Sequence, residues 1–197
     1  MRSDIYELDT LSSDYRAIPA EAEKVAGFIG LDKKSTMRLR LLAEEMICML
    51  PQLLIYGKGK FQIEAEGRDV ELHLSVTPYD MNASDRDKII SVSKSGKNAA
   101  AVGIVGKIVN AVEIMLADRA KIEKNDPYGY FSMGLAEYSD STAWSLMNYR
   151  DSFDSNAQTE KQEAWDELEK SIIAKLADDV IVGVLNGKVD IIVKKKF

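Results

Sequence analysis

The sequence contains few of the residues that cross-link a chain, bind metals or contact nucleic acids. Its single cysteine, Cys48, cannot form a disulfide within the chain and suits a reducing compartment. Its single histidine, His73, has no second histidine or cysteine near it in sequence, which argues against a metal site or a catalytic triad. With 26 Lys and Arg against 32 Asp and Glu, the chain lacks the basic excess of a nucleic-acid-binding protein.

Long apolar runs are also missing. The longest candidate, residues 99–116, is interrupted by Lys107, Asn110 and Glu113, whereas about 18 apolar residues are needed to span a bilayer. The first residues, MRSDIYELDTLSSDYR, lack the basic start and apolar stretch of a signal peptide. We therefore expect a cytoplasmic protein with no membrane segment. The length of 197 residues and the hydrophobic share of 46% fit one globular domain.

The acidic charge is concentrated in one segment. Residues 118–170 hold 12 Asp and Glu against 6 Lys and Arg, which accounts for the whole net charge of −6. Three aromatic residues of this segment, Trp144, Tyr149 and Phe153, allow two interpretations. They bury locally, or they form a partner-binding surface with an acidic rim.

Helical patterns occupy the first part of the chain. Residues 20–30 have helical composition and end on Gly30, a residue typical of the position after a helix. Asp32 or Ser35 can cap a second, longer helix that runs to about Leu50, just before Pro51. On a helical wheel this second helix has a core stripe and a mixed stripe that could line a cavity. The core stripe comprises Leu39, Leu42, Met46, Met49, Leu50 and Leu53, and the mixed stripe Met37, Leu41, Glu44, Cys48 and Gln52.

Two β-hairpins are predicted, the first from alternating apolar residues and the second from its turn. Residues 60–66 and 70–76 alternate around the turn Gly67-Arg68-Asp69. Near the end, residues 180–185 and 188–193 flank Asn186-Gly187, the strongest hairpin signal in the chain. A helix from Thr159 precedes this second hairpin, residues 99–117 predict another helix, and a short strand is expected around residues 5–8. The order predicts an α+β two-layer sandwich with a mostly antiparallel sheet and helices on one face.

Three stretches together resemble the ATPase domain of the histidine-kinase-like (Bergerat, GHKL) superfamily, particularly its anti-sigma-factor and serine-kinase branch. Residues 20–50 resemble the short helix, Gly-Leu link and nucleotide-facing helix of that branch. Residues 61–76 resemble the hairpin that follows. Residues 171–197 resemble the closing helix, with its Leu-x-Asp-x-Val exit, and the last hairpin. The resemblance implies one domain over residues 1–197, with residues 78–160 as a large insertion in the place of the ATP lid.

The motifs that bind Mg-ATP in that family are incomplete in this sequence. The resemblance places Glu44 or Glu45 at the catalytic Glu, so that Cys48 or Met49 replaces the Asn that ligates Mg²⁺. A thiol or a thioether is a poor ligand for this hard ion, which prefers oxygen. The adenine-binding motif would begin at Asp80, but no glycine follows it in residues 81–90. The glycines that bind phosphate before the closing helix are also absent from residues 160–170.

One stretch could restore phosphate binding. Gly96 and Lys97 precede a predicted helix, where free amides and the helix dipole favour an anion. Gly103 and Gly106 would permit close approach of the backbone to a phosphate. The alternative, which we favour, is a buried helix whose small residues allow tight packing.

The sequence as a whole predicts a bacterial, cytoplasmic regulatory protein on this ATPase fold, with a degenerate or lost nucleotide site and no cofactor. Its expected partner is a protein, such as a sigma factor or an anti-anti-sigma-like regulator, and a homodimer stays open. The alternative is an active serine/threonine protein kinase that binds ATP or ADP with Mg²⁺. In that case Glu44 or Glu45 is the base, and Gly96, Gly103 and Gly106 lie near the phosphates.

Overall fold

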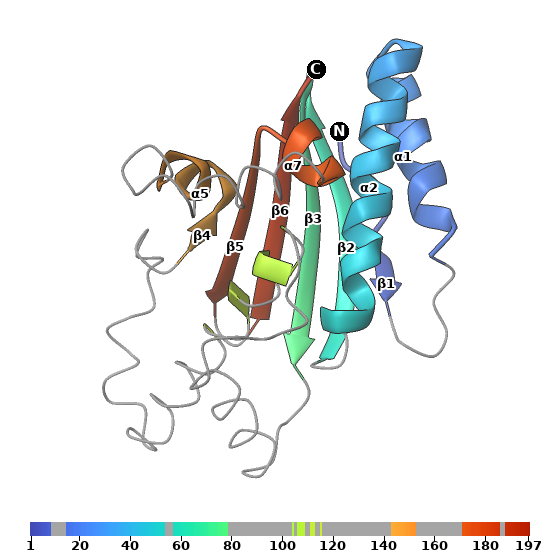
Figure 1. Cartoon of the computed structure of the whole chain (residues 1–197). Helices are drawn as coiled ribbons and strands as arrows, with labels where there is room; N and C mark the ends of the chain where they lie inside the picture. The colour runs from blue at the N-terminus through green and yellow to red at the C-terminus, as the bar shows by residue number, and fades with distance from the viewer. Residues whose placement is uncertain are drawn as a thin grey trace, which may run out of the picture.

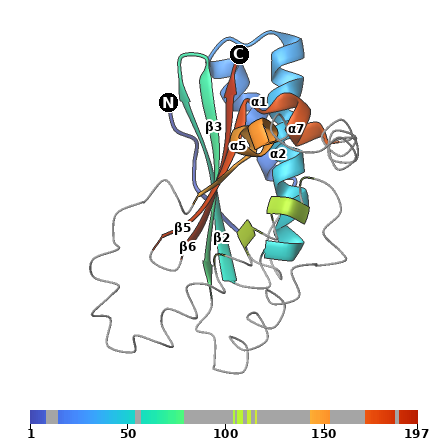
Figure 2. The same ribbon diagram turned by 60° about the vertical axis from the view of Figure 1, so that its left-hand side comes forward.

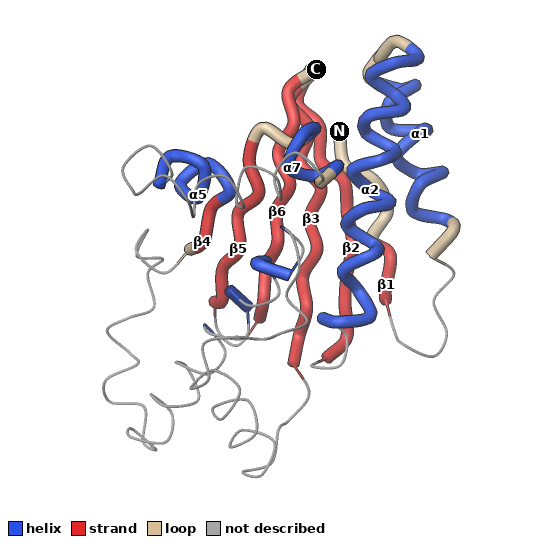
Figure 3. The backbone as a smooth tube through the Cα atoms, in the orientation of Figure 1, coloured by secondary structure: helices blue, strands red, loops and turns tan. Residues whose placement is uncertain are grey.

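The computed structural model describes residues 1–8, 15–53, 57–78, 104, 106–108, 111–112, 115, 143–152, 171–185 and 188–197. Four helices are bounded by Ala17–Phe28 (α1), Lys33–Leu53 (α2), Leu146–Ser152 (α5) and Ile172–Leu176 (α7). The strands are Tyr6–Leu8 (β1), Gly57–Glu66 (β2), Asp69–Pro78 (β3), Trp144–Ser145 (β4), Asp179–Leu185 (β5) and Lys188–Lys196 (β6). Figure 3 shows these elements along the backbone. No helix among the described residues is long and apolar enough to cross a membrane.

The six strands form one sheet in the order β1-β2-β3-β6-β5-β4, and all neighbours are antiparallel (Figure 1). The two predicted hairpins become β2–β3 and β5–β6, and the pairing of β3 with β6 joins them at the centre of the sheet. Figure 2 shows α1, α2, α5 and α7 on the same side of this sheet. The predicted α+β class and the mostly antiparallel sheet are therefore confirmed, and the arrangement is that of a two-layer sandwich.

The core lies between the helices and one face of the sheet. Because side chains alternate along a strand, the register places every second residue of neighbouring strands on this face. It comprises Phe61, Ile63 and Ala65 of β2, Val70, Leu72, Leu74 and Val76 of β3, Val189, Ile191 and Val193 of β6, and Val180 and Val182 of β5. From α2, four residues of the predicted core stripe are fully buried: Leu39, Leu42, Met46 and Met49.

The link between α1 and α2 follows from its sequence. Gly30 has a φ of +69°, a conformation that costs little only for glycine. The Gly30 and Leu31 amides donate to carbonyls of the last turn of α1, which forms a Schellman ending. Asp32 then caps α2, because its Oδ1 accepts a hydrogen bond from the Ser35 amide at 2.8 Å. The predicted helix end at Gly30 is confirmed, and Asp32 is the cap.

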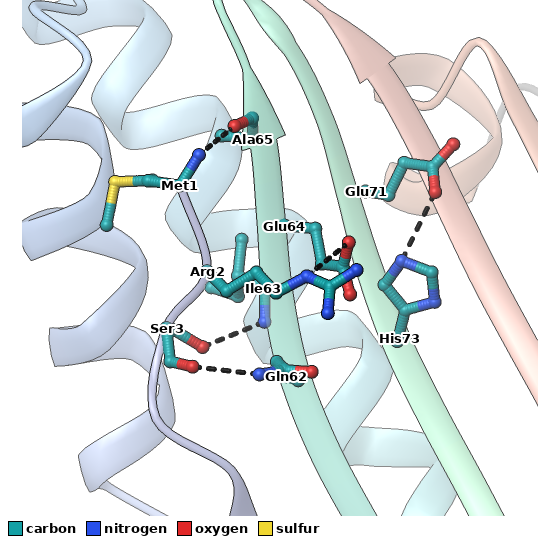
Figure 4. Close-up of polar contacts among 9 residues, drawn as sticks. All are labelled: Met1, Arg2, Ser3, Gln62, Ile63, Glu64, Ala65, Glu71 and His73. Carbon is teal, nitrogen blue, oxygen red and sulfur yellow. Dashed lines mark hydrogen bonds and ion pairs between the residues drawn. The ribbon is translucent and has the colours of Figure 1, made fainter.

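The chain forms a β-bulge just before the edge strand β1. Tyr6 pairs with Phe61, whereas Arg2 pairs with Glu64 in an isolated bridge, so the segment from Arg2 to Tyr6 has one residue more than β2 between these two pairs. At the bulge the Ser3 hydroxyl, instead of a backbone carbonyl, accepts a hydrogen bond from the Ile63 amide at 2.9 Å (Figure 4). Such a bulge bends an edge strand and disfavours pairing with another chain.

Part of the predicted lid insertion belongs to the sheet and the core. Within residues 78–160, β4 pairs with β5 and adds the sixth strand, and Leu146 of α5 is fully buried. Residues 104, 106–108, 111–112 and 115 are helical, and Ile104, Ile108 and Val112 join the core cluster. The predicted helix from Thr159 is wrong as one continuous helix: Ser171 is extended and caps α7, because its Oγ accepts a hydrogen bond from the Ala174 amide at 3.2 Å, and the described helix comprises only Ile172–Leu176. Residues 159–170 and the Asn186-Gly187 turn lie outside the described residues.

Candidate functional site

Helix α2 is the candidate site because it carries the two adjacent carboxylates and the thiol. It contacts α1 on one side and α7 on the other, and Figure 1 shows α2 between them over the sheet. Its fully buried residues point at the sheet, so Glu44, Glu45 and Cys48 occupy the flanks and the outer surface. The two flanks differ in chemistry.

Glu44 lies in an ion pair on the flank that faces α1. Arg40 Nε lies 2.8 Å from Glu44 Oε1, one helical turn away, and Arg40 Nη1 lies 2.5 Å from Glu23 Oε1 of α1. The hydrogen bonds to Glu44 and Glu23 raise the pKa of Arg40. The Glu44 side chain is 38% exposed. Arg40 thus holds Glu44 beside α1, and the role of Glu44 as a base stays a prediction.

Glu45 lies on the opposite flank. At 100° per residue, its side chain projects about 140° away from that of Arg40, which marks the α1 side. Glu45 is partly buried, and within the described part of the chain it has no hydrogen bond or ion pair. Burial, followed by the negative charge of Glu44, raises the pKa of the Glu45 carboxyl. A partly desolvated carboxylate without a counter-charge suits a proton acceptor.

Cys48 follows Glu45 by one turn and is exposed. Partial desolvation, then the charges of Glu45 and Glu44, raises the pKa of its thiol. Because the thiolate is the reactive form of cysteine, a raised pKa makes Cys48 a poor nucleophile. Across the residues that the structure describes, no group of three or more His, Cys, Asp and Glu side chains is arranged to hold a metal ion.

The other predicted site residues are described only in part. Asp80, Gly96, Lys97 and Gly103 lie outside the described residues. Gly106 is helical and buried, and its neighbours Ile104 and Ile108 are at most 1% exposed. This is the geometry of the buried-helix interpretation, and phosphate binding by these glycines stays a prediction.

Two aromatic residues of the acidic segment pack onto the fold. The rings of Trp144 and Tyr149 lie 5.9 Å apart between centroids, and both residues pack against the core cluster. Lys107 Nζ lies 5.3 Å from the centre of the Tyr149 ring, a cation–π distance. Both residues are partly buried, which favours local packing for them, and a partner-binding surface stays a prediction. Phe153 lies outside the described residues.

The outer face of the sheet is a network of paired charges. His73, predicted to point outward from its strand, lies there with Nε2 3.2 Å from Glu71 Oε2 (Figure 4). Glu71 also pairs with Lys194 at 3.1 Å. Lys196 pairs with Asp69 on the same face, and Lys195, which alternates to the helix side of the sheet, pairs with Asp178, so the three terminal lysines have carboxylate partners within the chain. This pairing explains the lysines without a ligand, whereas His73 Nε2 is buried and makes no hydrogen bond among the described residues.

Sequence reasoning missed a buried carboxylate in α1. Glu21 is 7% exposed, and its Oε2 accepts hydrogen bonds from the Tyr6 hydroxyl at 2.9 Å and from Lys24 at 3.0 Å. The hydrogen bond links β1 to α1. The available signal was the position of Glu21, which is three residues after Ile18 and four before Val25 on the apolar stripe of the helix.

Comparisons with known proteins give no relative for this chain. No protein-family model, no curated protein sequence and no solved structure matches it.

Proposed function

We propose that this chain is a bacterial, cytoplasmic regulatory protein built on a histidine-kinase-like ATPase fold, that its nucleotide site is degenerate, and that it acts by binding another protein. The observation that carries the proposal is Cys48, an exposed thiol of α2 at the position where the resemblance expects an Asn that ligates Mg²⁺. The arrangement around it supports the proposal. Two helices precede the first hairpin, and a short helix precedes the last hairpin. Both hairpins belong to one antiparallel sheet, and the elements follow one another along the chain as expected from the resemblance.

The alternative alignment of the motif is no better for metal binding. If Glu45 takes the position of the catalytic Glu, Met49 takes that of the Asn. Met49 is fully buried in the core, so its thioether cannot reach a metal ion in the site. Both alignments therefore lack an oxygen ligand at this point of the helix.

One observation favours an active kinase as the second candidate. Glu45 has a raised pKa, no described counter-charge and a place on the flank facing α7, which suits a general base. Such an enzyme would transfer the terminal phosphate of ATP to a serine or threonine, with Glu45 accepting the hydroxyl proton. Incubation with radiolabelled Mg-ATP and candidate protein substrates separates the two, because only the kinase labels a substrate and loses that labelling in Glu45→Gln.

The proposed partner is a protein, with a sigma factor or an anti-anti-sigma-like regulator as the first candidates, and the acidic segment as the proposed contact. A full deletion of residues 118–160 would remove β4 and α5, which belong to the sheet and the core. A variant that replaces only residues 118–142 with a flexible linker removes most of the acidic segment before β4 and keeps β4 and α5.

Isothermal titration of the full chain and of this linker variant against purified candidate regulators tests the proposal. We expect binding to the full chain and its loss in the variant, with an unchanged melting temperature as the control for folding. Equal binding by both proteins contradicts the proposed contact. Absence of binding to every regulator contradicts the proposed class of partner.

A further inference from the structure

The ends of two short helices, α5 and α7, meet at the start of β5. The first four N–H groups and the last four C=O groups of a helix have no partner within that helix. At this junction, a side chain of α5 binds carbonyls at the end of α7. The first side chain of β5, which follows α7, binds amides at the start of α5.

The C-terminal end of α7 depends on a residue of α5. The Ala174 carbonyl would accept the amide of Asp178 if the helix continued, but that amide donates to the Lys194 carbonyl of β6 at 2.9 Å. Arg150 of α5 supplies the missing donor, because its guanidinium donates to the Ala174 carbonyl and, at 3.2 Å, to the Asp178 carbonyl. Its positive charge also lies at the negative end of the α7 dipole.

The N-terminal end of α5 depends in turn on the first residue of β5. The Met147 amide donates to Asp179 Oδ1 at 3.0 Å, and the Asn148 amide donates to the Ser145 hydroxyl at 3.2 Å. The Ser145 hydroxyl itself donates to Asp179 Oδ1 at 3.1 Å. Asp179 therefore caps α5 both directly and through Ser145.

We infer that α5, α7 and the start of β5 unfold and refold locally as one cooperative unit, because Arg150 caps α7 and Asp179 caps α5. Local opening in proteins follows such contiguous units rather than single helices. Arg150 and Asp179 are positioning residues of this unit.

Hydrogen exchange of backbone amides in the full chain tests the inference. Asp179→Ala removes the cap of α5 and leaves the hydrogen bonds within α7 in place. In one cooperative unit, exchange rises in residues 172–177 as well as in 146–150, by roughly tenfold, the size expected for the loss of one cap. A rise confined to α5 overturns the inference. Arg150→Ala is the reciprocal test, since it must raise exchange in α5 as well as in α7.

Matched variants control for general destabilisation. Asn148→Ala changes an exposed side chain of α5 and is expected to leave exchange in α7 unchanged. Arg150→Lys keeps the charge but loses the two-pronged donor geometry, so it gives a smaller rise in α7 than Arg150→Ala. If Asp179→Ala also raises exchange in β2 and β3, it destabilises the whole protein, and the milder Ser145→Ala then replaces it as the test of the cooperative unit. Faster exchange in α7 of that variant supports the unit, and unchanged exchange overturns it.

Discussion

Replacement of Tyr6 with Phe tests the link between the edge strand β1 and helix α1. The Tyr6 hydroxyl donates to Glu21 Oε2 at 2.9 Å, and Glu21 is only 7% exposed. Phe keeps the ring and removes the donor. A hydrogen bond to a charged group contributes about 1.5–3 kcal/mol. Because Tyr6 is partly exposed and Lys24 still serves Glu21 at 3.0 Å, we expect the lower end, a loss of about 1.5 kcal/mol.

The same contact gives a pH signature. Burial, followed by the hydrogen bond to Glu21, raises the pKa of Tyr6 from 10.0 to about 12. The unfolded chain loses this proton near pH 10 and the folded chain near pH 12. The stabilising contribution is therefore fully present below pH 10 and is lost between pH 10 and 12. A shift of about two pKa units corresponds to at most about 2.7 kcal/mol, and less for a partly exposed side chain.

Urea unfolding of the wild type and Tyr6→Phe between pH 7 and 12 measures both effects. The difference between the two proteins isolates Tyr6 from the other tyrosines and from the lysines. We expect a constant difference up to pH 10 that declines towards pH 12, and a smaller effect of Tyr6→Phe in a Glu21→Gln background. Equal stability at pH 7 together with parallel alkaline profiles would refute this reasoning.

Two further substitutions test the core and the candidate site. Phe61→Ala truncates the largest fully buried side chain of β2 and is expected to lower the free energy of unfolding in urea by about 3–5 kcal/mol. Thr77→Ala, at an exposed position of the sheet, is the control and should lower it far less. Glu45→Gln removes a carboxylate whose pKa is raised by burial, so we expect a higher melting temperature at pH 7. This gain should vanish near pH 4, where Glu45 of the wild type is protonated. A change in melting temperature that does not depend on pH would contradict the partial burial of this charge.

The sheet could be predicted because its strands are regular. The alternation in residues 60–66 and 70–76 matches the face that the structure buries. The second hairpin was predicted from Asn186-Gly187 between two apolar runs. The wheel of α2 gave the core stripe for the same reason, since the burial of a long helix follows its 3.6-residue period. Chain order alone suggested that the two hairpins share one sheet, and the pairing of β3 with β6 confirms it.

The remaining features depend on contacts between distant residues. The strand β4 has two residues, and α5 is joined to its surroundings by Asp179, which caps its start, and by Arg150, which donates to the end of α7, so no local periodicity could reveal them. The bulge at Ser3 arises from the register with β2. The two carboxylates of α2 are adjacent in sequence, and only the position of α1, marked by the pair between Arg40 and Glu23, shows which flank each occupies.

Thermal unfolding with and without millimolar Mg-ADP or Mg-ATP tests the central claim, a degenerate nucleotide site, most directly. A ligand at 100 times its dissociation constant adds about 2.7 kcal/mol to the free energy of unfolding, which shifts the melting temperature by several degrees. The account predicts no shift with either nucleotide. A clear rise that requires both nucleotide and Mg²⁺ would contradict it and would favour the kinase.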